Sequence, residues 1–535
     1  MRSKKLQLML LGITAGAFCN IASAQLFIDQ ATFTIQSGAT VTVQGDVTSN
    51  TDILGTGKVI LKGTANQNVN MGGFTIPNIE IDNTANVTLT GNAKVGSTLL
   101  FTNGKILLGS NNLTFSDVAT ASGGGTCKFV ETNGTGQVIK LLTSNVTGVE
   151  LPVGAGTSYR PAFVTSSGTY SAANVGVKVL PVVEPNAPPK ISDYLAVYWP
   201  ITKTGVTGTV TVAGQYIDAA DITGSEANLR GYFYNGTDWN STGETHDAAL
   251  NRIAAPIATA SGNLFGMDKF VLAKAKVFLQ GAYNSVSGVM TDALRTPSNL
   301  IPLTDPYRSA PYNFIQVANA GAETVAASVF ADQVSTNDNI VDWVFVELRN
   351  NQVSPGNTVL QTRSALLKRD GNIVDIDGKS PVTFNNTING NYTVAVRHRN
   401  HLGISADPST NLLALAEQKS TASLLDLTSA TDAQIFGTSA AYAVVNGKNM
   451  LWSGNANFNI NLRWNPPSSD KDFILASPLI LNGVASSVPN NVYNVGDVNM
   501  DRRVRWNPPS SDKDFILSTS LTGLASTVRT QALPN

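Results

Sequence analysis

The side chains best suited to chemistry lie near the carboxyl end of the chain, where oxygen-bearing residues alternate along a short loop. Asp497, Asn499 and Asp501 occupy every second position of this loop. Ca²⁺ takes six to eight oxygen ligands, and a D-x-N-x-D spacing in a tight turn directs three side chains toward one ion. The segment therefore predicts a calcium site.

Further ligands of this site are expected a few residues later. Arg503 would contribute its backbone carbonyl, and Asp514 would close the coordination shell from the start of a helix, with Asp512 as a competing or supplementary ligand. Arg502 stands where such a loop usually has glycine, and about six residues are inserted before the closing acid relative to a twelve-residue EF-hand loop. The turn is therefore expected to have a shape of its own.

An internal repeat surrounds these residues. The thirteen residues 463–475 recur unchanged at 505–517, and their acidic residues can cap helix N-termini, so two loop-plus-helix units are expected. The first unit offers weaker candidate ligands that are mostly amides: Asn455, Asn457, Asn459, Asp470 and Asp472. Because the affinity of such loops rises with ligand charge, we expect the second loop to bind Ca²⁺ more tightly than the first.

The loop resembles the dockerin-type calcium loop. The repeat pair is similar to the C-terminal module of secreted, hemagglutinin-like and adhesin-like surface proteins of Gram-negative bacteria that use type IX secretion. This similarity extends upstream through the segments 276–281, 341–349 and 396–403. The resemblance implies a secreted adhesive protein with a calcium-binding C-terminal module, and that module could recruit a protein partner.

The rest of the chain shows little sign of a catalytic motif. His398 and His401 have the spacing of a zinc motif, but zinc catalysis needs a third protein ligand and usually a glutamate base, and no H-E-x-x-H is present. His246 is the only other histidine, and no G-x-S-x-G elbow supports a serine nucleophile. We therefore expect the histidine pair to have a structural role.

Carboxylates in the first part of the chain are scattered. The acids considered there are Asp46, Asp52, Glu80 and Asp82. A polysaccharide lyase or hydrolase needs such groups clustered on one face, so we predict a protein that is not an enzyme. The alternative is a carbohydrate-binding or polysaccharide-degrading enzyme component with a dockerin-type docking module. The expected partners are a glycan or cell-surface ligand, or a protein that binds the C-terminal module.

Aromatic side chains on predicted strands would be the platforms for such a glycan. Those considered are Trp199, Trp239, Trp343, Trp464, Trp506, Tyr194, Tyr198, Tyr232 and Tyr234. Aromatic residues on strands more often pack in cores, so we expect most of them to be core residues.

The charge of the chain and its amino-terminal segment indicate where the protein is located. The chain has 36 Lys and Arg against 37 Asp and Glu, with 14% charged residues, and lacks the basic stripe of a nucleic-acid-binding protein. Residues 1–24 combine a basic start, an apolar run and a small-residue cleavage site, which predicts a signal peptide. No later stretch reaches the ~18 apolar residues of a membrane span. We expect a secreted protein, extracellular or on the outer cell surface, with no transmembrane segment in the mature chain.

The elements that must position these residues are mainly β. Short alternating strands closed by Gly or Asn predict a parallel β-solenoid over residues 25–180, with an irregular β-sandwich as the alternative. A Pro-rich linker is expected at 181–190 and a β-sandwich at 191–275. An immunoglobulin-like or prealbumin-like sandwich region is expected at 276–450, followed by the dockerin-like repeat pair at 451–535. Cys127, expected on a strand, is left without a disulfide partner once Cys19 is removed with the signal.

Overall fold

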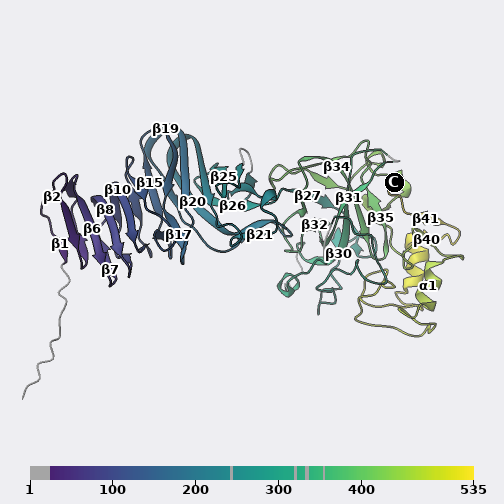
Figure 1. The fold of residues 1–535 in the computed structure, drawn as a ribbon. Helices are drawn as coiled ribbons and strands as arrows, with labels where there is room; N and C mark the ends of the chain where they lie inside the picture. The colour runs from purple at the N-terminus through teal and green to yellow at the C-terminus, as the bar shows by residue number, and fades with distance from the viewer. Residues whose placement is uncertain (1–24, 241–244, 319–321, 332–336, 354–355, 535) are drawn as a thin grey trace, which may run out of the picture. The chain divides into compact units, whose positions relative to one another are not determined.

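The computed structural model describes residues 25–240, 245–318, 322–331, 337–353 and 356–534 (Figure 1). The predicted signal peptide, residues 1–24, lies outside these ranges. The chain is mainly β, with 44% strand and 6% helix. It divides into one unit of residues 1–180 with 200–210 and a second of 181–199 with 211–535. In the part of the chain that is described, no helix is both long enough and apolar enough to cross a bilayer.

The first unit contains a β-solenoid of about six turns, which confirms the predicted architecture. One ladder of parallel strands consists of β1 (Leu26–Ile28), β4 (Val47–Ser49), β7 (Gln67–Asn70), β9 (Val87–Leu89), β11 (Ile106–Leu107), β14 (Val130–Glu131) and β17 (Val153–Ala155). The second consists of β3 (Thr40–Val43), β6 (Lys58–Gly63), β8 (Thr75–Asn83), β10 (Ala93–Asn103), β12 (Leu113–Phe115) and β15 (Val138–Leu142). A third, short ladder pairs β2 (Phe33–Ile35) with β5 (Ile53–Gly55).

Alternation within these short strands builds the solenoid core. Each strand directs every second side chain inward, and the parallel register stacks Val43, Leu61, Ile81 and Phe101 from successive turns. A buried amide pair interrupts this apolar stack. Asn83 Nδ2 donates to Gln67 Oε1 at 2.8 Å, and Gln67 Nε2 donates to Gly45 O at 2.7 Å, so the polar groups inside the solenoid are paired across turns.

The end of the solenoid is closed by antiparallel strands. β19 (Ala162–Val177) pairs antiparallel with β15 and with β16 (Val146–Leu151), as expected for a segment that leaves the stack. Cys127 was predicted to lie on a strand, and the structure places it elsewhere. It occupies an exposed turn with φ 57°, and its amide donates to Thr157 O at 3.1 Å.

In the second unit, the predicted Pro-rich linker is a packed segment. Glu184 is buried, and its carboxylate accepts hydrogen bonds from the Asn186 amide at 2.5 Å and from Asn263 Nδ2 at 2.8 Å. Trp239 Nε1 donates to Asn186 O at 3.3 Å. The segment therefore packs against the following strands and is not a free spacer.

The strands after this segment begin with one long strand. This is β20 (Tyr194–Gln215), within which Gly205 adopts φ 67°. The remaining strands are β21 (Ile222–Thr223), β22 (Arg230–Tyr234), β23 (Trp239–Asn240), β24 (Thr245–Asp247), β25 (Arg252–Pro256) and β26 (Ser261–Met267). The β22–β23 hairpin turns at Asn235–Gly236 as predicted.

A further sheet of the described residues has nine strands. Its main path runs β33 (Val382–Asn385), β27 (Phe270–Lys276), β32 (Asn372–Val374), β31 (Val359–Lys368), β30 (Ile340–Arg349), β34 (Gly390–His398) and β35 (His401–Ser405). β36 (Leu413–Leu415) pairs with β34, and β37 (Leu424–Asp426) pairs with β27. β27, which was expected at the end of the preceding sandwich, belongs to this sheet.

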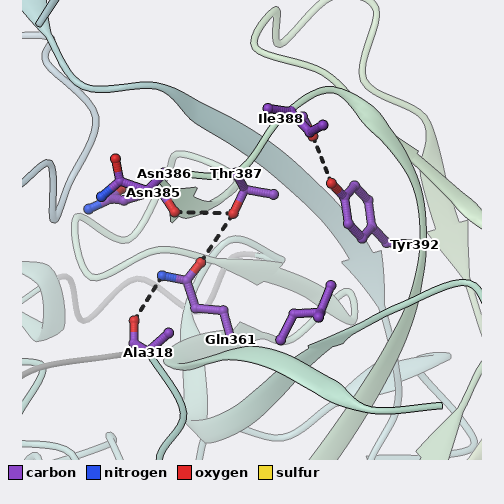
Figure 2. A pocket seen from close by; sticks show the side chains of 8 residues that line it. Ala318, Gln361, Asn385, Asn386, Thr387, Ile388 and Tyr392 are labelled. Carbon is purple, nitrogen blue, oxygen red and sulfur yellow. Dashed lines mark hydrogen bonds between the residues drawn. The ribbon is translucent and has the colours of Figure 1, made fainter. Parts of the chain in front are cut away.

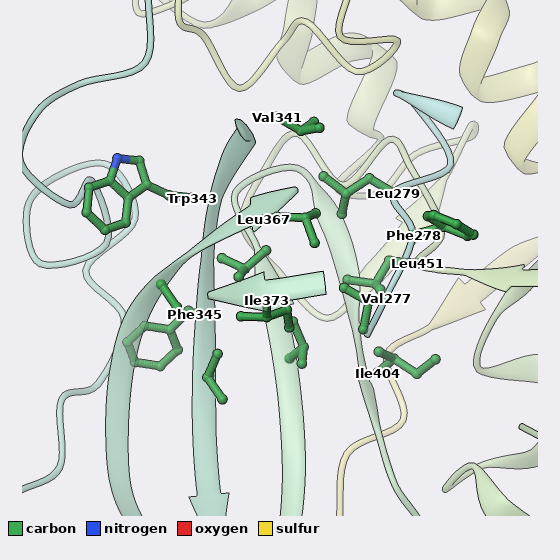
Figure 3. Close-up of a cluster of buried hydrophobic side chains, with 14 of the residues drawn as sticks. Val277, Phe278, Leu279, Val341, Trp343, Phe345, Leu367, Ile373, Ile404 and Leu451 are labelled. Atoms are coloured by element: carbon green, nitrogen blue, oxygen red, sulfur yellow. The ribbon is translucent and has the colours of Figure 1, made fainter. Parts of the chain in front are cut away.

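Figure 3 shows part of the core that packs against this sheet, and the same buried cluster extends into the C-terminal repeats. Ile474, Val498 and Ile516 of the repeats belong to the same buried cluster as Trp343 of β30. A Cβ atom at Gly281 would lie 2.2 Å from Val498 O, so the repeat chain approaches this segment at backbone distance. The repeats are therefore packed on the sheet.

Each repeat contains a short helix at the predicted place. α1 spans Asp470–Ala476, and α2 spans Asp512–Phe515 and continues as a π turn over Ile516–Ser520. Ser469 and Ser511 are the N-caps, and their hydroxyls accept hydrogen bonds from the amides of Asp472 and Asp514. β40 (Asn461–Arg463) of the first repeat pairs with β41 (Val528–Thr530) after the second.

Candidate metal centre

The second loop is organised around the carboxylate of Asp497. This side chain is buried; Oδ1 accepts a hydrogen bond from the Asp501 amide at 2.9 Å and Oδ2 accepts one from the Arg502 amide at 3.0 Å. Asn499 Oδ1 also accepts from the Asp501 amide, at 3.1 Å. Asp501 Oδ1 in turn accepts from the Arg503 amide at 3.0 Å. The predicted alternating residues therefore share one tight turn.

The acid that faces this turn is Asp512. Its side chain is buried, with Oδ1 accepting from the Val498 amide at 2.9 Å and Oδ2 from the Arg505 amide at 2.7 Å. Asp514, expected to close the shell, is 44% exposed and lies 3.5 Å from Lys513 Nζ. The helix starts at Asp512, which turns that residue toward the loop and leaves Asp514 partly exposed, so Asp512 is the better-placed candidate to close the shell.

Burial disfavours the charged forms of these carboxylates. Burial, together with the nearby charge of Asp501, raises the pKa of Asp497 to about 7. Burial and the charge of Asp497 raise the pKa of Asp512 well above its usual value. Burial also raises the pKa of Asp501. Acids that repel one another in a buried turn become more stable when a cation or a proton neutralises them.

The donor set is compatible with Ca²⁺, although it is not a dense cluster of acids. Within the described ranges, no three His, Cys, Asp or Glu side chains are arranged around one metal position. An ion here would therefore depend on the amide oxygen of Asn499 and on backbone carbonyls, such as that of Arg503, in addition to the aspartates. Calcium accepts such mixed oxygen ligands.

The first loop has the same frame with fewer charges. Asp470 takes the place of Asp512: Oδ1 accepts from the Ala456 amide at 3.0 Å and Oδ2 from the Arg463 amide at 2.8 Å. Burial raises the pKa of Asp470 to about 8. Asp472, like Asp514, is exposed, and it pairs with Lys471.

Amides fill the remaining positions of the first loop. Asn455 Nδ2 donates to Asn459 O at 2.7 Å, and Asn457 Oδ1 accepts from the Asn459 amide at 3.2 Å. Asn459 Oδ1 accepts from the Asn461 amide at 2.6 Å. Hydrogen bonds of these amides hold the turn, with Asp470 as its one buried carboxylate.

Both loops meet at Asn400, in the turn between β34 and β35. Its carbonyl oxygen accepts hydrogen bonds from the amides of Gly454 at 2.9 Å and Asn455 at 3.0 Å, at the start of the first loop. Its side chain donates to Asp497 O at 2.8 Å and Val495 O at 3.2 Å, at the start of the second. One buried residue in this turn thus holds the first candidate ligand of each loop, Asn455 and Asp497, in place.

A buried polar cluster supports this junction. Asp342 on β30 lies 3.1 Å from His398 Nε2 and 2.9 Å from Arg399 Nε, and it accepts a hydrogen bond from the Tyr493 hydroxyl at 2.7 Å. Burial alone would raise the pKa of Asp342, but Arg399 and His398 hold it at about 2. Arg399 also donates to Asn494 O, just before the second loop. The cluster therefore ties β30 and the β34–β35 turn to the loop.

The histidine pair lies inside this cluster. The Nδ1 atoms of His398 and His401 are 2.9 Å apart, and His401 Nε2 accepts the Gly281 amide hydrogen at 3.1 Å. Burial lowers the pKa of both rings. The ring nitrogens are engaged in hydrogen bonds within the core, so the geometry gives the pair a structural role. His246 is elsewhere, 2.9 Å from the Tyr216 hydroxyl.

The scattered acids of the solenoid connect successive turns. Glu80 and Asp82 pair with Lys58 at 2.5 Å and Lys62 at 2.6 Å. The carboxylates of Asp46 and Asp52 accept backbone amide hydrogens of the following turn, from Asn68 at 2.7 Å and Thr75 at 2.6 Å. These contacts form ladders along the stack and do not bring the acids together as a catalytic pair.

Most of the aromatic candidates lie in the core. Trp199, Trp239 and Trp343 are buried. Trp464 and Trp506, one in each repeat, are half-buried and carry a lysine ammonium over the ring at 5.3 Å and 5.2 Å. A surface pocket near β31 and β34 is lined by Gln361, Thr387, Tyr392 and neighbouring residues (Figure 2). That lining contains no acid or histidine, so it offers no acid–base pair.

Several of these residues were not predicted from the sequence. The contacts between the sheet and the loops are made by Asn400, Asp342 and Tyr493. The only local sequence signal for such contacts was the polar run Arg397–His401 between two apolar strands. Comparison with known proteins adds no further assignment: no family model matches the chain, and neither the curated proteins nor the solved structures include a match.

Proposed function

We propose that this chain is a secreted, non-enzymatic surface protein with a structural or adhesive role, and that Ca²⁺ stabilises its C-terminal repeats. The β-solenoid would act as a spacer, and the second unit would carry the calcium-dependent module. This proposal follows the resemblance to hemagglutinin-like surface proteins with dockerin-like repeats. The observation that carries it is the buried pair Asp497 and Asp512, whose carboxylates accept hydrogen bonds from backbone amides and, among the described residues, from no basic side chain.

The second loop is the main calcium site in this proposal. Asp497, Asn499, Asp501 and Asp512 would hold the ion with the backbone carbonyl of Arg503. The ion would neutralise the buried carboxylates directly, and its ligands would keep the loop closed on the sheet. The first loop, with Asp470 as its one buried carboxylate, would bind weakly or remain empty.

Several features favour a structural role over catalysis. The solenoid acids are used in ladders between turns, and the His398–His401 pair is enclosed in the core. Asn400 and Arg399 anchor the second loop to the sheet. This anchoring favours a structural role for the loop over a role as a docking surface for another protein.

Calorimetry on the whole chain tests the metal assignment. The whole chain is needed because the repeats share their core with the sheet. Asp501→Ala should abolish the dominant calcium-binding heat, whereas Asn459→Ala, its counterpart in the first loop, should leave that heat nearly unchanged. Equal losses from the two substitutions, or no binding heat in the parent chain, would contradict the assignment.

A further inference from the structure

Another pair of buried acids lies outside the C-terminal repeats. Asp193 directly precedes β20, and Asp268 lies in the short link between β26 and β27. Asp268 is fully buried, and Asp193 is 8% exposed. The Asp268 amide donates to Asp193 O at 2.7 Å, so the two residues are neighbours. They meet where the chain passes from β26 into the nine-stranded sheet.

One carboxylate oxygen of this pair lacks a partner. Asp268 Oδ2 accepts hydrogen bonds from the Ser192 amide at 3.2 Å and from the Ser192 hydroxyl at 2.8 Å. Asp268 Oδ1 is buried as well, and it makes no hydrogen bond with any residue that the structure describes. A buried charged oxygen costs far more than a neutral one when it is unpaired, so such an atom needs a donor or a cation.

The groups that donate to the pair are neutral. Asp193 Oδ1 accepts from the Ser225 amide at 2.6 Å, and Asp193 Oδ2 accepts from Asn228 Nδ2 at 2.7 Å. Neither acid forms an ion pair with a basic side chain in the described ranges. Burial raises the pKa of Asp268, and the charge of Asp193 raises it further. Two negative charges therefore lie close together without a positive one.

Other oxygen atoms lie beside the pair. A Cβ atom at Gly224 would lie 2.1 Å from Asp193 Oδ1 and 2.6 Å from Ser192 O, so a carboxylate and a carbonyl oxygen approach the same glycine. Asn228 brings an amide oxygen into the neighbourhood of Asp193. Carboxylate, carbonyl and amide oxygens are the ligands that Ca²⁺ prefers. Since the described residues hold no group of three acidic, histidine or cysteine ligands, neutral oxygens would complete the shell.

We propose that Asp193 and Asp268 form a calcium site at the junction between β26 and β27, separate from the loops of the repeats. Two carboxylates balance the charge of one divalent ion, and the ion would give Asp268 Oδ1 the partner that it lacks. The bound ion would hold the start of β20 and the turn 224–228 to the β26–β27 link. With two carboxylates against three in the second loop, this junction should bind calcium more weakly than that loop.

Counting the bound ions on the whole chain tests this proposal. Equilibrium dialysis with radioactive calcium gives the count, and thermal unfolding in EDTA and in saturating calcium gives the effect on stability. Asp268→Asn keeps an acceptor for Ser192 and removes the charge, and Asp193→Asn is an independent second variant. Asp501→Ala removes the candidate site in the second loop. Asp218→Asn, at an exposed acid outside the junction, is the matched control.

Asp268→Asn and Asp193→Asn should each bind one calcium ion fewer than the parent and the control. Asp268→Asn combined with Asp501→Ala should bind two fewer. In EDTA, Asp268→Asn should melt no lower than the parent, because it loses an unpaired buried charge. In saturating calcium, its rise in melting temperature should be smaller than that of the parent.

An unchanged ion count in both junction variants would overturn the proposal. So would a difference in melting temperature between Asp268→Asn and the parent that is the same in EDTA and in calcium, since a proton or a water molecule would then satisfy Asp268. If only Asp501→Ala lowers the count, the junction site is refuted and the calcium loop of the proposed function stands. If only the junction variants lower it, the junction site stands and the calcium loop is refuted.

Discussion

The side-chain amide of Asn400 donates a hydrogen bond to the carbonyl oxygen of Asp497 at 2.8 Å, between residues 97 positions apart. Asn400 belongs to the turn between β34 and β35, and Asp497 is the first ligand position of the second loop. The sheet therefore fixes the candidate calcium loop directly. Any ion bound in that loop should stabilise the sheet as well as the repeats, because the two are thermodynamically linked.

Asn400→Ala is expected to weaken both parts. It would leave the buried carbonyls of Asp497 and Val495 without a donor, and each unsatisfied buried group costs about 1–3 kcal/mol, so we expect a loss of about 2–4 kcal/mol in the free energy of unfolding. Calcium affinity should fall with it. Chemical denaturation and calorimetry measure the two effects. Asn337→Ala, at an exposed site, is the control, and a variant as stable as that control would refute the role of Asn400.

Asp512→Asn and Asp514→Asn separate the two candidate closing acids. Asp512 is buried against the loop, and Asp514 points to solvent, so only the first substitution should remove calcium binding. In the parent chain, calcium at a hundredfold excess over its Kd should stabilise the fold by about 2.7 kcal/mol. Thermal unfolding with and without calcium tests this. Loss of the calcium effect in the Asp514 variant alone would restore the assignment made from the sequence.

Local patterns made the solenoid and the repeats predictable. Alternating strands such as Val59–Leu61 and the turn residues between them specify a stacked turn without knowledge of distant contacts. The thirteen identical residues specify a helix that starts at the same place in each repeat.

The junction was not predictable for the opposite reason. Tyr493 and Asp342 are 151 positions apart, and no local pattern links residues so distant. The choice between Asp512 and Asp514 depended on where the helix starts. The N-cap at Ser511 sets that start, and the inserted residues before it obscured the position.

Asp82→Ala addresses the enzyme alternative. Asp82 pairs with Lys62 on the solenoid surface, and Asn103 Nδ2 donates to it at 2.8 Å, so we expect little change in stability after the substitution. Reducing-sugar assays on a polysaccharide panel should detect no turnover by the parent or by the variant. Sustained cleavage by the parent that the variant loses would show that the solenoid carries an active site.

The dependence of stability on pH should become weaker when calcium is bound. Asp470 and Asp497 have folded-state pKa values raised by burial to about 8 and about 7, above the usual value near 3.9 of an unfolded chain. For a group with a raised folded-state pKa, the contribution to stability is complete below the unfolded value and is lost as the pH rises through the folded value. Without calcium, the contribution of Asp470 and Asp497 to the free energy of unfolding should therefore fall between pH 4 and pH 8, while His398 and His401, whose pKa values burial lowers, contribute in the opposite sense at the acidic end of this range.

Calcium should cancel the part of this fall that comes from the second loop, because the ion takes the place of the proton on Asp497. Calcium affinity should accordingly rise from pH 5 to pH 8, with proton release measurable by calorimetry in buffers of different ionisation heat. Asp470→Asn should reduce the fall that remains in saturating calcium, because an amide does not titrate. A calcium affinity independent of pH over this range would show that Asp497 is not protonated in the calcium-free protein, and that burial does not control the charge of this loop.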